Sequence, residues 1–260
     1  MIRTTQDRIE EIKKNGYTLD FGNVFNHAFE NYKKIALYSG LILFVGIILI
    51  SILLAIIALS IFDSETVLEK LKAENLQPEN LSLNSMLIFS GVTILITCLL
   101  SPFTAGLIKM AYCAERDEEF HVSTMFEYYK APYFKELFIA ILLISLLSTG
   151  IPELLDYAQI PFVGFLITIL TTFFTFLTIP LIIFGNLKAV EAIQASVLIV
   201  SKQPIVLLGL FVIGIIATFV GLIGCCIGIV FTIPFMYSLY YAIYSEIIGF
   251  DPETGIENRN

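Results

Sequence analysis

Charged residues are scarce in this chain, and those present are clustered. They make up 15% of its 260 residues, against about 25% in an average soluble domain. Long stretches therefore lack Asp, Glu, Lys, Arg and His altogether, which excludes an ordinary soluble fold. A bilayer core needs about 20 consecutive apolar residues, which must be helical because lipid offers the backbone no hydrogen-bonding partner. The uncharged runs are Ile35–Phe62 (28 residues), Asn80–Ile108 (29), Tyr157–Leu187 (31), Gln203–Ser245 (43) and the shorter Leu137–Pro152 (16).

Catalytic and metal-binding residue types are almost missing from those runs. The two histidines, His27 and His121, both lie outside them, so neither a buried Ser–His hydrolase nor a multi-histidine iron site can be assembled. No GxxxxGK[ST] or HExxH motif is present. The ionisable residues Lys109, Glu153 and Glu246 fall near span ends, which weakens a proton pump or a voltage sensor. We therefore expect no enzymatic activity, no cofactor and no metal site.

The run Gln203–Ser245 is too long for one membrane-spanning helix. As a single helix it would reach about 65 Å, roughly twice the hydrocarbon thickness. We place a tight turn at GLIGCCIG (Gly221–Gly228), where Cys225 and Cys226 are interpreted as small packing residues or, alternatively, as a vicinal disulfide. The chain is then one polytopic all-α domain with a cytoplasmic tail and interfacial helix (1–34), a bundle (35–248) and a C-terminal tail (249–260). The six predicted spans are 35–61, 86–110, 134–152, 160–184, 204–223 and 226–248.

Positive charge is unevenly distributed between the predicted loops. Six spans put both termini on one side with the 109–135 and 185–203 loops, and that side holds 13 of the 15 Lys and Arg residues. Only Lys70 and Lys72, in the 62–85 loop, lie on the other side. The positive-inside rule then places both termini in the cytoplasm. No basic surface suits nucleic acid.

Three amphipathic segments precede the odd-numbered spans. In the first, Asp20 is a candidate N-cap, and a capping box at Thr124 and Glu127 opens the second. The third is Leu187–Lys202. An aromatic helical face followed by lysine is typical of an interfacial helix. The anchoring pairs are each nine residues apart: Phe25 and Lys34, Phe126 and Lys135, and Ile193 and Lys202.

The even-numbered spans share an internal proline. We interpret Pro102, Pro180 and Pro234 as helix kinks. Together with the amphipathic segments they predict three repeats, each an interfacial helix followed by a transmembrane hairpin. The alternative is that amphipathic entries and span prolines are common in any polytopic protein.

Small residues recur at helical spacing in the last three predicted spans. Such residues let helices approach closely and hydrogen-bond to each other, so we favour a packing role. The alternative is a polar lining for a substrate path. The residues are Thr168, Thr171, Thr172, Thr175 and Thr178 in the fourth span, and Gly214, Gly221, Gly224 and Gly228 in the fifth and sixth.

The chain resembles a broad group of uncharacterised bacterial six-span proteins. These are similar to the membrane domain found in some glycerophosphodiester phosphodiesterases, whose enzyme domain has no counterpart here, so the resemblance implies no catalysis. It implies a multi-pass protein of the bacterial inner membrane. The resemblance is carried by FGNVFNHAFENYKK, SPFTAGLIKMA…FHVSTMFEYYK and NLKAVEAIQASVLIVSKQPIVLLGL, with Ala192-x-x-x-Ser196, Lys202 and a final helix containing Tyr237, Tyr240, Tyr241 and Tyr244.

Two functions of different classes fit these observations. The first is a non-enzymatic membrane component that scaffolds or regulates a protein partner, or organises lipid, through its cytoplasmic interfacial segments. The second is a carrier or permease subunit for a neutral or amphiphilic solute. A water-accessible cavity reaching the middle of the bilayer would favour the carrier, and a solidly packed bundle would favour the first function.

Overall fold

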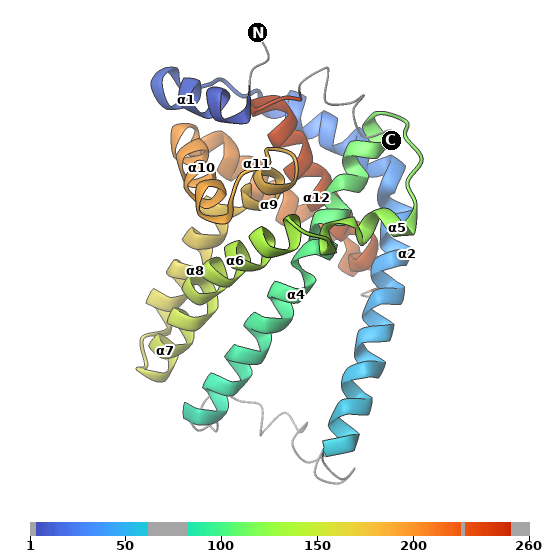
Figure 1. Cartoon of the computed structure of the whole chain (residues 1–260), viewed down its shortest axis with the longest axis vertical. Helices are drawn as coiled ribbons and strands as arrows, with labels where there is room; N and C mark the ends of the chain where they lie inside the picture. Colours follow the sequence, from blue (N-terminus) through green and yellow to red (C-terminus); the bar gives the residue numbers. More distant parts are fainter. Residues whose placement is uncertain (1–3, 62–82, 225–226, 251–260) are drawn as a thin grey trace.

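The computed structural model describes residues 4–61, 83–224 and 227–250, and every regular element within those ranges is helical. Long helices run downward from a crowded upper end that also carries α1 (Figure 1). The buried core lies at this upper end. The elements are α1 (Thr5–Asn15), α2 (Phe21–Ile61), α4 (Leu83–Glu115), α5 (Val122–Met125), η2 (Glu127–Tyr129), α6 (Tyr133–Ser145), η3 (Leu146–Gly150), α7 (Ile151–Tyr157), α8 (Pro161–Thr175), α9 (Thr178–Ile183), α10 (Ala189–Lys202), α11 (Pro204–Val220), η4 (Gly221–Gly224) and α12 (Ile227–Ile247).

Five helical segments in the described part of the chain are long and apolar enough to cross a membrane. They match the first five predicted spans, although the third continues through a π-helical turn, η3, as far as Tyr157. The sixth predicted span forms α12 but is not among the five. Six crossings and three repeats therefore stay predictions. The five segments are Phe21–Leu53, Leu83–Glu115, Tyr133–Tyr157, Pro161–Ile183 and Pro204–Ile223.

The first predicted interfacial helix is not a separate element. Asp20 caps it as predicted, since its Oδ1 accepts the backbone N–H of Asn23 at 2.7 Å. The helix then continues without a break through the first span as α2, 41 residues long. Its aromatic face packs on α12: the Phe25 and Phe235 rings meet edge-on with centroids 5.8 Å apart. This face is therefore part of a helix–helix interface.

α12 lies beside the first half of α2 only. The two helices are antiparallel, since Ser238 donates its hydroxyl to the Ala28 carbonyl at 2.8 Å, while the Phe231 ring fills the space beside Gly40. From Gly40 to Ile61, α2 continues for another 21 residues, about 32 Å of helix. Figure 1 shows the lower ends of α2, α4 and the α7–α8 pair extending below α12. The α11–α12 hairpin therefore ends closer to the upper end of the protein than α2, α4 and the α7–α8 pair do.

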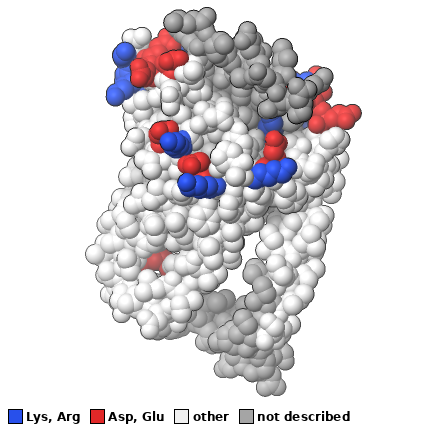
Figure 2. Space-filling model, viewed as in Figure 1, with Lys and Arg blue, Asp and Glu red and all other residues white. Residues whose placement is uncertain are grey.

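The lower half of α2 exposes apolar side chains along its length, as a lipid-facing helix does. Charged residues gather instead over the upper end, while the described part of the lower surface on this face is almost entirely uncharged (Figure 2). The exposed apolar residues include Leu41, Val45, Ile48, Leu49, Ile52, Leu53, Ile56 and Leu59.

The second predicted interfacial helix is replaced by two short pieces, α5 and η2. The predicted capping box at Thr124 and Glu127 is wrong, because α5 begins at Val122 with His121 at its N-cap, and Thr124 lies inside it. This segment is pressed onto α4. Met125 is fully buried, and its backbone lies 2.7 Å from where a Cβ on Gly106 would stand, so the approach requires glycine there.

The three span prolines are accommodated differently. α4 runs unbroken through Pro102, and the Ser101 hydroxyl donates at 2.7 Å to the Cys98 carbonyl, the group that Pro102 leaves without an N–H partner. α12 is likewise continuous through Pro234. The fourth predicted span is interrupted, since α8 ends at Thr175 and α9, which contains Pro180, begins at Thr178.

The N-terminal segment forms a helix that covers the upper end. α1 is capped by a reciprocal Thr4–Asp7 box and is tied to α12, because Arg8 Nε donates to the Ile247 carbonyl at 3.0 Å. Just after α1, the Tyr17 hydroxyl donates to the Ile199 carbonyl at 3.0 Å. Burial raises the pKa of Tyr17 well above its usual range, so this donor stays protonated at neutral pH.

Candidate functional site

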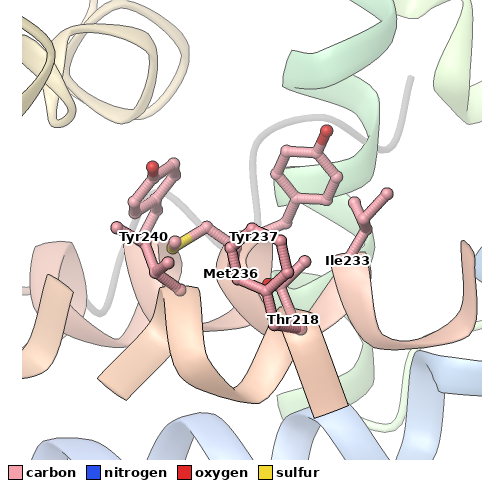
Figure 3. Close-up of a pocket in the computed structure, with 7 residues that line it drawn as sticks. Thr218, Ile233, Met236, Tyr237 and Tyr240 are labelled. Carbon is pink, nitrogen blue, oxygen red and sulfur yellow. The ribbon is translucent and has the colours of Figure 1, made fainter. Parts of the chain in front are cut away.

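The α11–α12 hairpin contains an open cavity of about 330 Å³, within the lower part of the range of about 300–1,000 Å³ typical of ligand pockets. Figure 3 shows side chains of α12 projecting into it beside Thr218 of α11. None of the lining side chains carries a charge at neutral pH. The lining residues are Ile215, Thr218 and Phe219 of α11, and Ile233, Met236, Tyr237 and Tyr240 of α12.

Close backbone contact holds the hairpin together at the end away from α1. Cβ atoms on Gly221 or Gly228 would overlap the backbone of the other residue. Further along α11, a Cβ on Gly214 would lie 2.9 Å from both Leu239 Cδ2 and Met236 Sδ. Three of the four predicted glycines therefore stand where two helices meet. For the fourth, Gly224, only the backbone is described, as the last residue of η4.

The two threonines of the hairpin use their hydroxyls internally. Thr218 donates to the Gly214 carbonyl at 2.9 Å, and Thr232 donates across the hairpin to the Thr218 carbonyl at 2.7 Å. The cavity therefore presents Thr218 mainly through its methyl group.

The polar groups of the cavity are two phenols on one face of α12. Tyr237 lies within hydrogen-bonding reach of Thr104 on α4. Tyr240 packs its ring 5.3 Å from that of Phe176, and its hydroxyl has no hydrogen-bond partner in the described part of the chain. In Figure 3 both rings rise from the same side of α12, with Met236 between them.

A polar cluster joins α2, α4 and α12 at the charged end. The two ring nitrogens of His27 lie 3.1 Å from Glu115 Oε2 and 3.5 Å from Glu246 Oε1, and the Tyr241 hydroxyl donates to Glu115. The described residues hold no group of three or more His, Cys, Asp and Glu side chains arranged to bind a metal ion. We interpret this cluster as a partly exposed polar tie between three helices, since the Glu115 and Glu246 side chains are 38% and 42% exposed.

The predicted threonine stripe does not line the cavity. Thr168 donates to the Ser148 carbonyl at 2.8 Å, which joins α8 to η3. Thr175 donates to the Thr171 carbonyl of its own helix at 2.7 Å. Thr172 is exposed, whereas Thr178 is fully buried and its hydroxyl lacks a partner among the described residues.

The predicted anchors fall into two groups. Lys34 donates to the Ala114 carbonyl and pairs with Asp117, each at 2.8 Å, at the end of α4. Lys202 donates to the Lys13 carbonyl at 2.9 Å, at the end of α1. Both lysines therefore satisfy helix C-terminal carbonyls. Phe126 and Lys135 are also exposed, and no hydrogen bond from Lys135 to a helix carbonyl is seen among the described residues.

No protein-family model, curated protein or solved structure matches this chain. The site must therefore be interpreted from its own geometry. Sequence analysis singled out Tyr237 and Tyr240 only through a resemblance and assigned them no role. Their spacing of three residues, which puts both on one helical face, was the available signal.

Proposed function

We propose that this chain is a non-enzymatic, multi-pass membrane protein that binds and organises lipids from the cytoplasmic side of the membrane. The observation that carries the proposal is the change in surface along the molecule. An upper end with exposed lysines and aromatic rings adjoins a lower surface whose described residues are almost all uncharged in this view and include many exposed apolar side chains (Figure 2). Such a boundary matches the boundary between headgroups and acyl chains.

The proposal places the charged end and both termini in the cytoplasm. Every described Lys and Arg belongs to the loops and segments that the positive-inside rule assigns to that side. An even number of crossings keeps the termini together whether the α11–α12 hairpin crosses the bilayer or turns back within it. The resemblance to bacterial six-span proteins supports the bacterial inner membrane as the location.

Exposed side chains on the second amphipathic segment supply lipid contacts. Phe126 is 52% exposed and Tyr129 37% exposed, and aromatic rings of this kind favour the headgroup level. Lys130 and Lys135 are exposed beside them. Basic residues at a membrane surface attract anionic headgroups by about 1 kcal/mol each. The same surface is available to a cytoplasmic protein partner, which is the scaffold form of the proposal.

A carrier for a neutral or amphiphilic solute is the second candidate, and the cavity between α11 and α12 is the observation that favours it. A carrier also needs a polar path beyond this cavity. Two of the threonines predicted to line such a path, Thr168 and Thr175, donate their hydroxyls to carbonyl groups of the protein itself. This arrangement favours packing and hence the lipid-organising function.

The lipid composition around the protein tests the proposal. Discs cut directly from membranes with a styrene–maleic acid polymer would be analysed by mass spectrometry and compared with discs around an unrelated multi-pass protein. We expect anionic lipid to be enriched, and the Lys130→Gln/Lys135→Gln variant to lose much of the enrichment. Lys72→Gln, in the predicted outer loop, is the control and should change nothing. Identical compositions in all discs, or solute uptake into vesicles containing the protein, would contradict the proposal.

A further inference from the structure

We propose that the α11–α12 cavity binds one acyl chain of a membrane lipid together with its ester carbonyl. The inference rests on the proposed lipid-organising function and adds a defined site and a ligand class to it. The ligand is an uncharged, acylated amphiphile or the equivalent portion of a larger lipid. The site is distinct from the lysines and aromatic rings of the second amphipathic segment.

The cavity has an apolar end and a phenolic end. Ile233 lies seven residues before Tyr240 on α12, about 10 Å along the helix. The side chains of Ile215, Phe219 and Ile233 are hydrocarbon only, and the two tyrosines stem from positions nearer the C-terminal end of α12 than Ile233. That end of α12 reaches the ionic cluster of Glu246 and His27. The polarity of the cavity therefore rises toward the charged end of the protein, as it does along a lipid from chain to headgroup.

The hydroxyl of Tyr240 provides the specific contact. It is a donor without an acceptor in the described part of the chain, and the tyrosine is partly exposed beside the cavity. A donor in a low-dielectric environment is stabilised when it gains an acceptor. An ester carbonyl is the acceptor that membrane lipids carry at the boundary between chain and headgroup, so Tyr240 and an acyl ester are complementary.

The absence of charge among the lining residues selects against an ionised group in the cavity. No lysine, arginine or carboxylate is among the seven lining residues, and an unpaired charge is costly to bury. The rim at Phe219 is 58% exposed, and Ile216 on the adjoining surface is 53% exposed. The cavity therefore continues onto the apolar surface that lipid chains cover, which gives a lipid direct access.

Photolabelling of the protein in phosphatidylcholine vesicles tests this site. The probe is a monoacylglycerol with a diazirine near the end of its acyl chain, and an alkane with the same diazirine is the comparison probe. Cross-linked peptides would be located by mass spectrometry. Tyr240→Phe removes the hydroxyl and keeps the ring. Ile215→Trp fills the cavity, whereas Ile216→Trp puts the same bulk on the exposed neighbouring position and is its matched control.

We expect the ester probe to label α11 and α12 in the wild-type protein and in Ile216→Trp, and Ile215→Trp to abolish this labelling. Tyr240→Phe should lower labelling by the ester probe about two- to tenfold, the range that one net hydrogen bond corresponds to, and leave labelling by the alkane unchanged. Equal labelling of all variants, or labelling of the lower half of α2 as strong as that of the hairpin, would overturn the proposal. Tyr240→Phe decides the matter even if Ile215→Trp fails to fold. If photolabelling overturned the acyl-chain site, anionic lipid could still be enriched in the polymer-bound discs. The two experiments therefore test the two proposals independently.

Discussion

Lys34 donates its ammonium group to the carbonyl oxygen of Ala114 at 2.8 Å. Lys34 lies within α2, and Ala114 is the penultimate residue of α4, so the contact ties the upper ends of two candidate spans. A lysine at this position also opposes the partial negative charge of the helix C-terminus. The residue that sequence analysis assigned to the lipid interface therefore stabilises the protein itself.

Replacement of Lys34 should lower stability, and replacement of its neighbour should not. We expect Lys34→Met to cost about 1 kcal/mol, since a helix-terminal charge and a partly exposed ion pair are lost. Lys33→Met removes an exposed pair with Glu30 within the same helix and should cost a few tenths of a kcal/mol. Thermal unfolding of both variants in the same detergent measures the difference, and equal melting temperatures would contradict this role for Lys34.

Gly221 should tolerate no side chain. A Cβ there would stand 2.5 Å from the Gly228 carbonyl carbon and from the Ile229 nitrogen, and backbone atoms cannot move aside without opening the hairpin. We expect Gly221→Ala to destabilise the protein by at least about 2 kcal/mol. Gly91→Ala is the control, because a Cβ at that helical position meets nothing within 4 Å; it should be neutral or stabilising by up to about 1 kcal/mol. A fully stable Gly221→Ala protein would show that the two helices do not approach so closely.

Two threonines of the same stripe should respond differently to loss of the hydroxyl. Thr168→Val removes the bond to the Ser148 carbonyl and should cost about 1 kcal/mol. Thr172 is exposed, so Thr172→Val should leave the melting temperature unchanged. If instead both variants kept full stability and abolished uptake of a solute, the stripe would line a transport path and the carrier function would be favoured.

The depth of the α11–α12 hairpin can be measured by thiol labelling. Because α12 covers α2 only as far as Gly40, we expect the end of α11 to lie within the bilayer. A cysteine placed at Ile223, in a chain otherwise free of cysteine, should resist a membrane-impermeant maleimide applied from outside intact cells. Ser64→Cys in the predicted outer loop should react, and Ser201→Cys at the charged end should react only after the membrane is opened. Rapid external labelling at position 223 would establish the sixth crossing that the sequence predicts.

Apolar runs predicted the helical segments well, because the length of a span and the cost of an unpaired backbone in lipid are local properties. Asp20 was likewise found from its own residue type and position. The packing role of Phe25 could not be predicted in this way. Its spacing shows that one helical face is aromatic, but not whether lipid or another helix covers that face. The capping box predicted at Thr124 was wrong, because α5 begins at Val122. Met125, the residue after Thr124, packs on Gly106, a contact between distant parts of the sequence that local spacing does not report. The phenols of Tyr237 and Tyr240 became a site only through the position of α11.

The most direct test of the central claim is native mass spectrometry of the tagged protein released from a mild detergent. The account predicts retained lipid molecules, including one adduct whose abundance falls about two- to tenfold in Tyr240→Phe and is unchanged in Ile216→Trp. A protein released without lipid and carrying a water-soluble metabolite in stoichiometric amount would contradict it.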